Sequence, residues 1–134
     1  MTILIQNNAE GDALEYLVNR AAPQNLVLRL FENNVTPAET DTAASYTEAT
    51  FAGYASVTLV GATWGAPSEG APSLIAFPQQ TFTSTAVQNK NVYGYYYTRA
   101  ASGRIAGAER DPAAPFNILN VGDQYKVTPQ ITAD

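Results

Sequence analysis

The 134-residue sequence contains no cysteine and no histidine. Without cysteine, the chain can form no disulfide, has no thiolate nucleophile and cannot hold zinc or an iron–sulfur cluster through sulfur. Without histidine, it lacks the most common general base and the most common metal ligand of proteins. Serine–histidine–aspartate and cysteine–histidine catalysis are therefore excluded, and we expect no bound cofactor.

Charged residues are also scarce. They make up 14% of the chain, and seven basic residues against twelve acidic ones give a net charge of -5. The basic residues form no run, so we expect no binding to nucleic acid or to an anionic membrane. The N-terminus is apolar only over residues 3–5, and no window reaches transmembrane length, which predicts neither a signal peptide nor a membrane span.

One short helix is predicted near the N-terminus. Asp12 and Glu15 match the Asp-x-x-Glu capping pattern, and Pro23 would end the helix. Between them, four apolar residues at helical spacing would form the face that packs on the core: Leu14, Leu17, Val18 and Ala21. We therefore predict an amphipathic helix over residues 13–21.

The rest of the chain is typical of an all-β domain. Thr, Val, Tyr and Phe occur in short runs separated by Gly, Pro and Asn. The clearest predicted strands are 26–31, 54–59, 80–85, 92–98 and 124–132, and weaker patterns predict strands at 3–6, 47–51 and 118–121. This spacing favours an antiparallel β-sandwich or barrel with the helix at one side, and jelly-roll and immunoglobulin-like topologies both stay open.

Residue alternation and loop length add two expectations. Within 26–31, leucines alternate with Val27, Arg29 and Phe31, which predicts that the leucines face the core. The segments 61–78 and 100–115 are rich in Gly and Pro and are predicted to be long loops, a type that is commonly functional or ordered against a partner. No linker divides the chain, so we expect a single domain over residues 1–134.

Carboxylates cluster at Glu39, Asp41 and Glu48, and again at Glu109 and Asp111. Such groups can act as paired acid and base in glycoside hydrolysis, or bind calcium. Their spacing matches neither an EF-hand nor a repeat-type calcium loop, and Asp41 lies in a segment that lacks the glycine of the Asp-Thr-Gly turn of aspartic proteases. We interpret them as solvated loop residues and predict no catalytic residues, no metal site and no enzyme activity.

The aromatic residues provide the interface candidates. Alternation over 92–98 places Tyr93, Tyr95 and Tyr97 on one face of a strand. These phenols could form a contact surface or a stacking platform for a ligand, or pack onto neighbouring strands with Gly94 at a close backbone approach, which we favour. Trp64, the only tryptophan, would anchor its loop to the core or bury against another chain.

Several segments, in their order and spacing, resemble a family of small structural proteins of tailed bacteriophages that are encoded beside the major capsid protein. The segments that carry this resemblance are LRLFENNVTP at 28–37, YTEA at 46–49, GYA at 53–55, FPQQTF at 77–82 and VYGY at 92–95. The resemblance runs from the predicted helix to the last predicted strand. It offers no catalytic residues to transfer.

The resemblance implies a virion component that is assembled in the host cytoplasm. It points to a capsid decoration or cement protein, commonly a homotrimer, which binds the major capsid protein on the outer surface of the head and stabilises it. A tail or head–tail component is an alternative virion role. A carbohydrate- or ligand-binding β domain, using the tyrosines or Trp64 for stacking, is an alternative outside the virion.

Overall fold

The computed structural model describes residues 3–133 and confirms an antiparallel all-β fold with one N-terminal helix. The helix α1 spans Asn7–Leu17, and two short 3-10 helices, η1 and η2, span Ala43–Ser45 and Gly61–Thr63. The strands are β1 (Leu26–Phe31), β2 (Val57–Leu59), β3 (Ser73–Ala76), β4 (Gln80–Thr83), β5 (Lys90–Val92), β6 (Gly94–Arg99), β7 (Ile105–Arg110), β8 (Phe116–Ile118), β9 (Gln124–Val127) and β10 (Gln130–Ala133).

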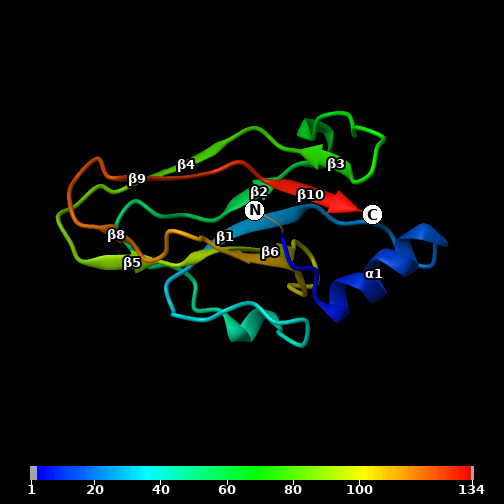
Figure 1. Ribbon diagram of the computed structural model, residues 1–134, viewed down its shortest axis with the longest axis horizontal. Coiled ribbons are helices and arrows are strands. Elements are labelled where there is room, and N and C mark those ends of the chain that lie inside the picture. The colour runs from blue at the N-terminus through cyan, green and yellow to red at the C-terminus, as the bar shows by residue number, and fades with distance from the viewer. Residues whose placement is uncertain (1–2, 134) are drawn as a thin grey trace.

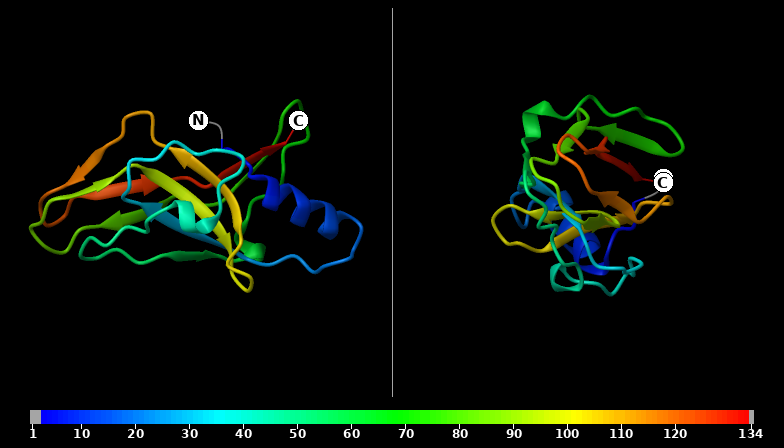
Figure 2. Two further views of the ribbon diagram at one scale, coloured as in Figure 1. Left: turned by 90° about the horizontal axis from the view of Figure 1, so that it is seen from below. Right: turned by 90° about the vertical axis from the view of Figure 1, so that its left-hand side faces the viewer.

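A four-stranded sheet forms the centre of the molecule, in the order β2-β1-β6-β7. Three two-stranded ribbons, β10–β3, β4–β9 and β5–β8, complete the pairing. The molecule is elongated, with α1 at one end and the loops around β5 and β8 at the other (Figures 1 and 2). The two ends are therefore built from different parts of the chain.

Two hydrophobic clusters lie on opposite faces of the central sheet. The larger one joins the sheet to the ribbons, and its members include Leu28, Leu30, Tyr95, Tyr97, Phe82, Tyr125 and Val127. The smaller one contains Phe31, Tyr46, Tyr96, Ile105 and Ala108. Leucines 28 and 30 thus face one cluster while Phe31 faces the other, which confirms the alternation predicted for 26–31.

The predicted strands agree with the observed ones to different degrees. β1 has the predicted bounds, whereas 54–59 and 80–85 are shortened to β2 and β4. The predicted strand 124–132 divides into β9 and β10 around Pro129, which has no N–H to donate to a ladder. The predicted strand 92–98 divides at Tyr93. Of the weaker predictions, 118–121 overlaps β8, but 3–6 and 47–51 supply only single bridges, Leu4 to Ala108 and Glu48 to Phe31.

The prediction of two long loops is wrong in part, because each contains a strand. β3 lies within 61–78 and pairs with β10, and β7 lies within 100–115 and pairs with β6. β7 reads Ile-Ala-Gly-Ala-Glu-Arg, which has few β-favouring residues. Small residues are needed there, because a Cβ on Gly107 would come within 2.7 Å of the Ile3 side chain.

The helix begins and ends earlier than predicted, at Asn7 and Leu17, so that Ala21 lies beyond it, and it packs on a different face. Leu14, Leu17 and Val18 are 65%, 81% and 71% exposed, so the predicted core face points to solvent. Asp12 lies inside the helix instead of capping it and pairs with Arg99, whose Nε donates to the Asp12 carboxylate at 2.8 Å. The side chains that dock α1 are thus polar and small, and an apolar periodicity could not identify them.

Arg99 connects the helix to the central sheet. Its guanidinium lies 4.7 Å from the ring centroid of Tyr16, and the whole residue is 8% exposed. Arg104 also reaches the Asp12 carboxylate, at 3.2 Å. Asp12 therefore compensates a buried positive charge at the end of β6.

Replacing Asp12 with alanine is expected to lower the free energy of unfolding by about 3 kcal/mol, because the buried Arg99 charge loses its partner. The matched control is Glu15→Ala, which removes an exposed 3.7 Å pair with Arg20 and should change stability by less than about 0.5 kcal/mol. Urea unfolding of both variants gives the comparison. Equal effects would show that the Asp12 pair does not dock the helix.

Gly94 marks the close backbone approach expected from the sequence. A Cβ at this position would overlap the Glu109 carbonyl oxygen and come within 2.8 Å of the Phe31 ring. Gly94→Ala is therefore expected to cost about 1–3 kcal/mol in urea unfolding. Gly11, inside α1, has no atom within 4 Å of the position that a Cβ would take, so Gly11→Ala should stabilise the protein by about 0.5–1 kcal/mol. A Gly94→Ala variant as stable as the parent would refute the overlap.

Candidate functional site

The three tyrosines predicted to share one face are divided between the two sides of the sheet. Tyr95 and Tyr97 lie in the larger cluster, 4% and 0% exposed, with ring centroids 5.7 Å apart. Tyr93 packs against the smaller cluster, where the Arg110 guanidinium lies 5.2 Å from its ring centroid. The shared face is therefore correct for Tyr95 and Tyr97 and wrong for Tyr93, which lies between β5 and β6.

Trp64 is half-buried and packs against the larger cluster. Its ring meets Phe77 edge-on, with centroids 5.3 Å apart. It anchors the segment between β2 and β3 to the core, which is one of the two roles expected from the sequence. With Tyr95 and Tyr97 buried as well, the four interface candidates do not form an exposed aromatic platform on this chain.

Buried and half-buried tyrosines are instead paired with acidic residues. Four phenols donate hydrogen bonds to carboxylates: Tyr46 to Asp41 at 2.7 Å, Tyr54 to Glu48 at 2.7 Å, Tyr125 to Asp111 at 2.9 Å, and Tyr95 to Glu109. The interpretation of these acids as solvated loop residues is thus wrong for Glu109, which is 6% exposed. For the other three it misses a structural role.

Burial raises the pKa of six tyrosines above the ordinary value of a phenol: Tyr46, Tyr54, Tyr95, Tyr96, Tyr97 and Tyr125. In the four that donate to a carboxylate, that hydrogen bond raises the pKa further. These phenols therefore stay protonated, and remain donors, in the folded protein.

The protein is expected to unfold at alkaline pH. A tyrosine pKa that is higher in the folded than in the unfolded chain stabilises the fold below the unfolded value of about 10. That stability is lost as the pH rises further, by about 1.4 kcal/mol per pH unit for each protected phenol. Tyrosinate absorbance should therefore rise together with the loss of circular dichroism. Ionisation of these phenols in a protein with native circular dichroism would contradict the raised pKa values.

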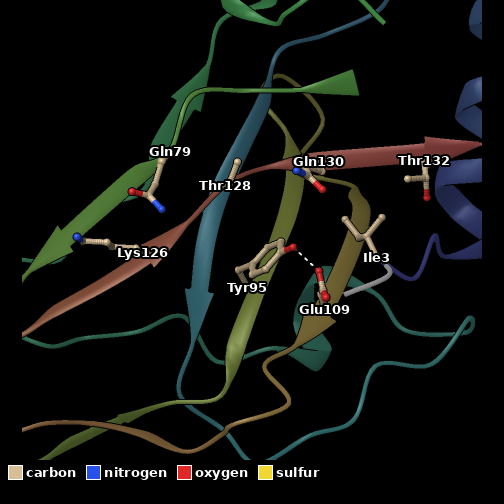
Figure 3. A pocket seen from close by; sticks show the side chains of 8 residues that line it. All are labelled: Ile3, Gln79, Tyr95, Glu109, Lys126, Thr128, Gln130 and Thr132. Atoms are coloured by element: carbon tan, nitrogen blue, oxygen red, sulfur yellow. Dashed lines mark hydrogen bonds between the residues drawn. The ribbon is translucent and has the colours of Figure 1, made fainter. Parts of the chain in front are cut away.

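The Tyr95–Glu109 pair lies at the floor of a cleft of about 280 Å³. β6 and β7 supply the pair, and the cleft is walled by side chains of the β9–β10 segment (Figure 3). Tyr95 and Glu109 are register partners on adjacent strands. The sequence identifies Tyr95 as a candidate but not its hydrogen bond to Glu109, because β7 itself is not predicted.

Within residues 3–133, six of the eight exposed large apolar side chains lie at the C-terminal part of α1 or in the loops beside β5 and β8, and the other two are Val60 and Phe116. We call Leu14, Leu17 and Val18 the helix end. We call Val87, Leu119 and Val121 the loop end; these residues are 80%, 45% and 64% exposed. The two loops that carry them are joined by a hydrogen bond from the Gln88 N–H to the Leu119 carbonyl. Exposed apolar groups concentrated in this way are typical of contact surfaces.

A groove of about 330 Å³ lies beside the helix end, between α1 and β10. Its walls are mainly apolar and include Ile5, Ala9, Ala13, Leu26 and Ile131.

Within residues 3–133, no group of three or more acidic side chains is arranged to hold a metal ion, and no helix is long and apolar enough to cross a membrane. The chain matches no family model, no curated protein and no solved structure.

Proposed function

We propose that this chain is a virion structural protein, a capsid decoration or cement protein that binds the outer surface of a bacteriophage head. The observation that carries the proposal is the concentration of exposed apolar side chains at both ends of an elongated β molecule. A protein that ties subunits together needs two separate contact regions, and the helix end and the loop end meet this need. The resemblance of the sequence to small phage structural proteins supports the same role.

The side-chain chemistry also fits a contact role. Four carboxylates accept hydrogen bonds from phenols, and Tyr95 and Tyr97 lie in the larger cluster with Trp64 packed against it. These contacts hold the centre of the molecule together, whereas the helix end and the loop end each expose leucine and valine side chains. Burying a leucine or valine of this kind contributes about 1.5–3 kcal/mol per side chain to an association.

The partner proposed for these ends is the major capsid protein, with the decoration protein bound as a homotrimer. Shells that lack the chain should take it up when it is added back, and their thermal disruption should move to higher temperature because the chain binds only the assembled state. Co-sedimentation and scanning calorimetry measure the two effects. Light scattering of the free protein should give the mass of a trimer.

Variants at the ends make the test specific. Leu17→Asp and Val121→Asp are expected to weaken shell binding by about tenfold or more, since each removes an apolar contact and adds a charge. Thr81→Asp, at an exposed position of β4 between the two ends, is the matched control and should bind as the parent does. No uptake by shells, or uptake that neither end variant weakens, would refute the proposal. Electron microscopy of the virion separates a head from a tail location.

A further inference from the structure

The cleft above Tyr95 and Glu109 has the features of a ligand site. It has a volume of about 280 Å³, enough for a ligand of several heavy atoms. Its floor comes from the central sheet and its wall from the β9–β10 segment, as Figure 3 shows. The residues that line it include Ile3, Tyr95, Glu109, Lys126, Thr128 and Gln130.

Glu109 is the central group of this cleft. Its Oε2 accepts the hydrogen bond from the Tyr95 hydroxyl, while its Oε1 is buried and has no hydrogen-bond partner among the described residues. None of the ion pairs within residues 3–133 includes Glu109. A buried carboxylate oxygen without a donor is unfavourable, and a charged N–H group satisfies it best.

The wall of the cleft supplies the remaining acceptors for such a group. Thr128 and Gln130 lie two residues apart on the β9–β10 segment and both line the cleft. In Figure 3, Gln130 stands across from the Tyr95–Glu109 pair. An ammonium group has three N–H donors, which one carboxylate oxygen and two wall oxygens can accept. Ile3 and the Tyr95 ring offer apolar surface to attached methylene groups.

Lys126 limits what the rest of the ligand can carry. It lines the cleft on the side of Gln79, away from Glu109 in Figure 3. A second positive charge on the ligand would be repelled at that position. The arrangement is therefore suited to a single cation with an apolar or anionic remainder.

We propose that this cleft binds a primary ammonium group, with Glu109 as its counter-ion. The group can belong to a free alkylamine or to a lysine side chain of another protein. This assignment does not depend on a virion role, because it rests on the cleft of the isolated chain.

The test is a titration of the full chain with n-butylammonium chloride at constant ionic strength, followed by amide resonances in NMR spectra. Saturable shifts are expected at residues that line the cleft. Tetramethylammonium, which has the charge but no N–H donor, should bind at least about tenfold more weakly. 1,4-Diaminobutane should gain nothing over butylammonium from its second charge. Shifts that do not saturate, as for a cleft filled by water alone, or equal binding of tetramethylammonium, would overturn the proposal.

Two variants locate the site. Glu109→Gln keeps an acceptor for the Tyr95 hydroxyl but removes the charge, and should abolish butylammonium binding. Gln130→Ala changes an exposed side chain, so folding is retained, and should weaken binding several-fold. Gln124→Ala, on β9 but outside the cleft, is the matched control. Unchanged binding in either cleft variant would refute the site, and Gln130→Ala keeps the test decisive even if Glu109→Gln is unstable.

A final pair of ligands distinguishes the two sources of the ammonium group. Nα-acetyl-lysine methylamide presents the amine as a protein does, and butylammonium presents it as a free small molecule. Tighter binding of the lysine derivative assigns the cleft to a partner's side chain, and tighter binding of butylammonium assigns it to a free amine. Failure of both ligands to bind overturns the proposal.

Discussion

The hydrogen bond from a buried or half-buried tyrosine to a carboxylate is the interaction on which the rest of this structure depends. It occurs four times, and three of the acceptors, Asp41, Glu48 and Asp111, lie outside the strands. Each bond gives the phenol O–H an acceptor, and three of the four fix a connecting segment that carries the acid. The protein can therefore keep long ordered connections around a small sheet with few ion pairs.

The same interaction explains why composition alone is misleading here. Only 14% of the residues are charged, so few charged side chains are available for the surface. Even so, four of the twelve acidic residues accept hydrogen bonds from tyrosine hydroxyls. The helix end and the loop end nevertheless expose leucine and valine side chains. The number of charged side chains left on the surface thus depends on the hydrogen bonds that the tyrosines require as well as on any partner.

Much of the fold could be predicted from the sequence where a local pattern matches a local structure. The strand at 26–31 has clear alternation, and both its bounds and its faces are correct. The helix register could not be predicted, because α1 docks through Ala9 and the Asp12–Arg99 pair, and the contact with β6 is distant in sequence. β7 could not be predicted either, because its small residues accommodate neighbouring side chains and carry no strand signal of their own.

The candidate site shows the same division. Tyr95 stands out in the sequence as one of a row of phenols, but the orphaned oxygen of Glu109 exists only once β6 and β7 are paired and the β9–β10 segment covers them. The acidic residues at 109 and 111 are visible in the sequence as a cluster. Their separate roles, one in a cleft and one as the acceptor for Tyr125, are a product of tertiary packing.

The strand pairing also has a consequence for how the chain folds. Within the described residues, β6 and β7 are joined by a short turn. Other paired strands are far apart in the sequence, namely β1 and β6, β3 and β10, β4 and β9, and β5 and β8. Pairings between distant segments require large loops to close first, which slows folding. During synthesis, β1 can pair with β2 first, but its other edge stays unpaired until β6 has left the ribosome. The nascent chain therefore passes through a period of exposure to aggregation, which ends when the β6–β7 hairpin arrives.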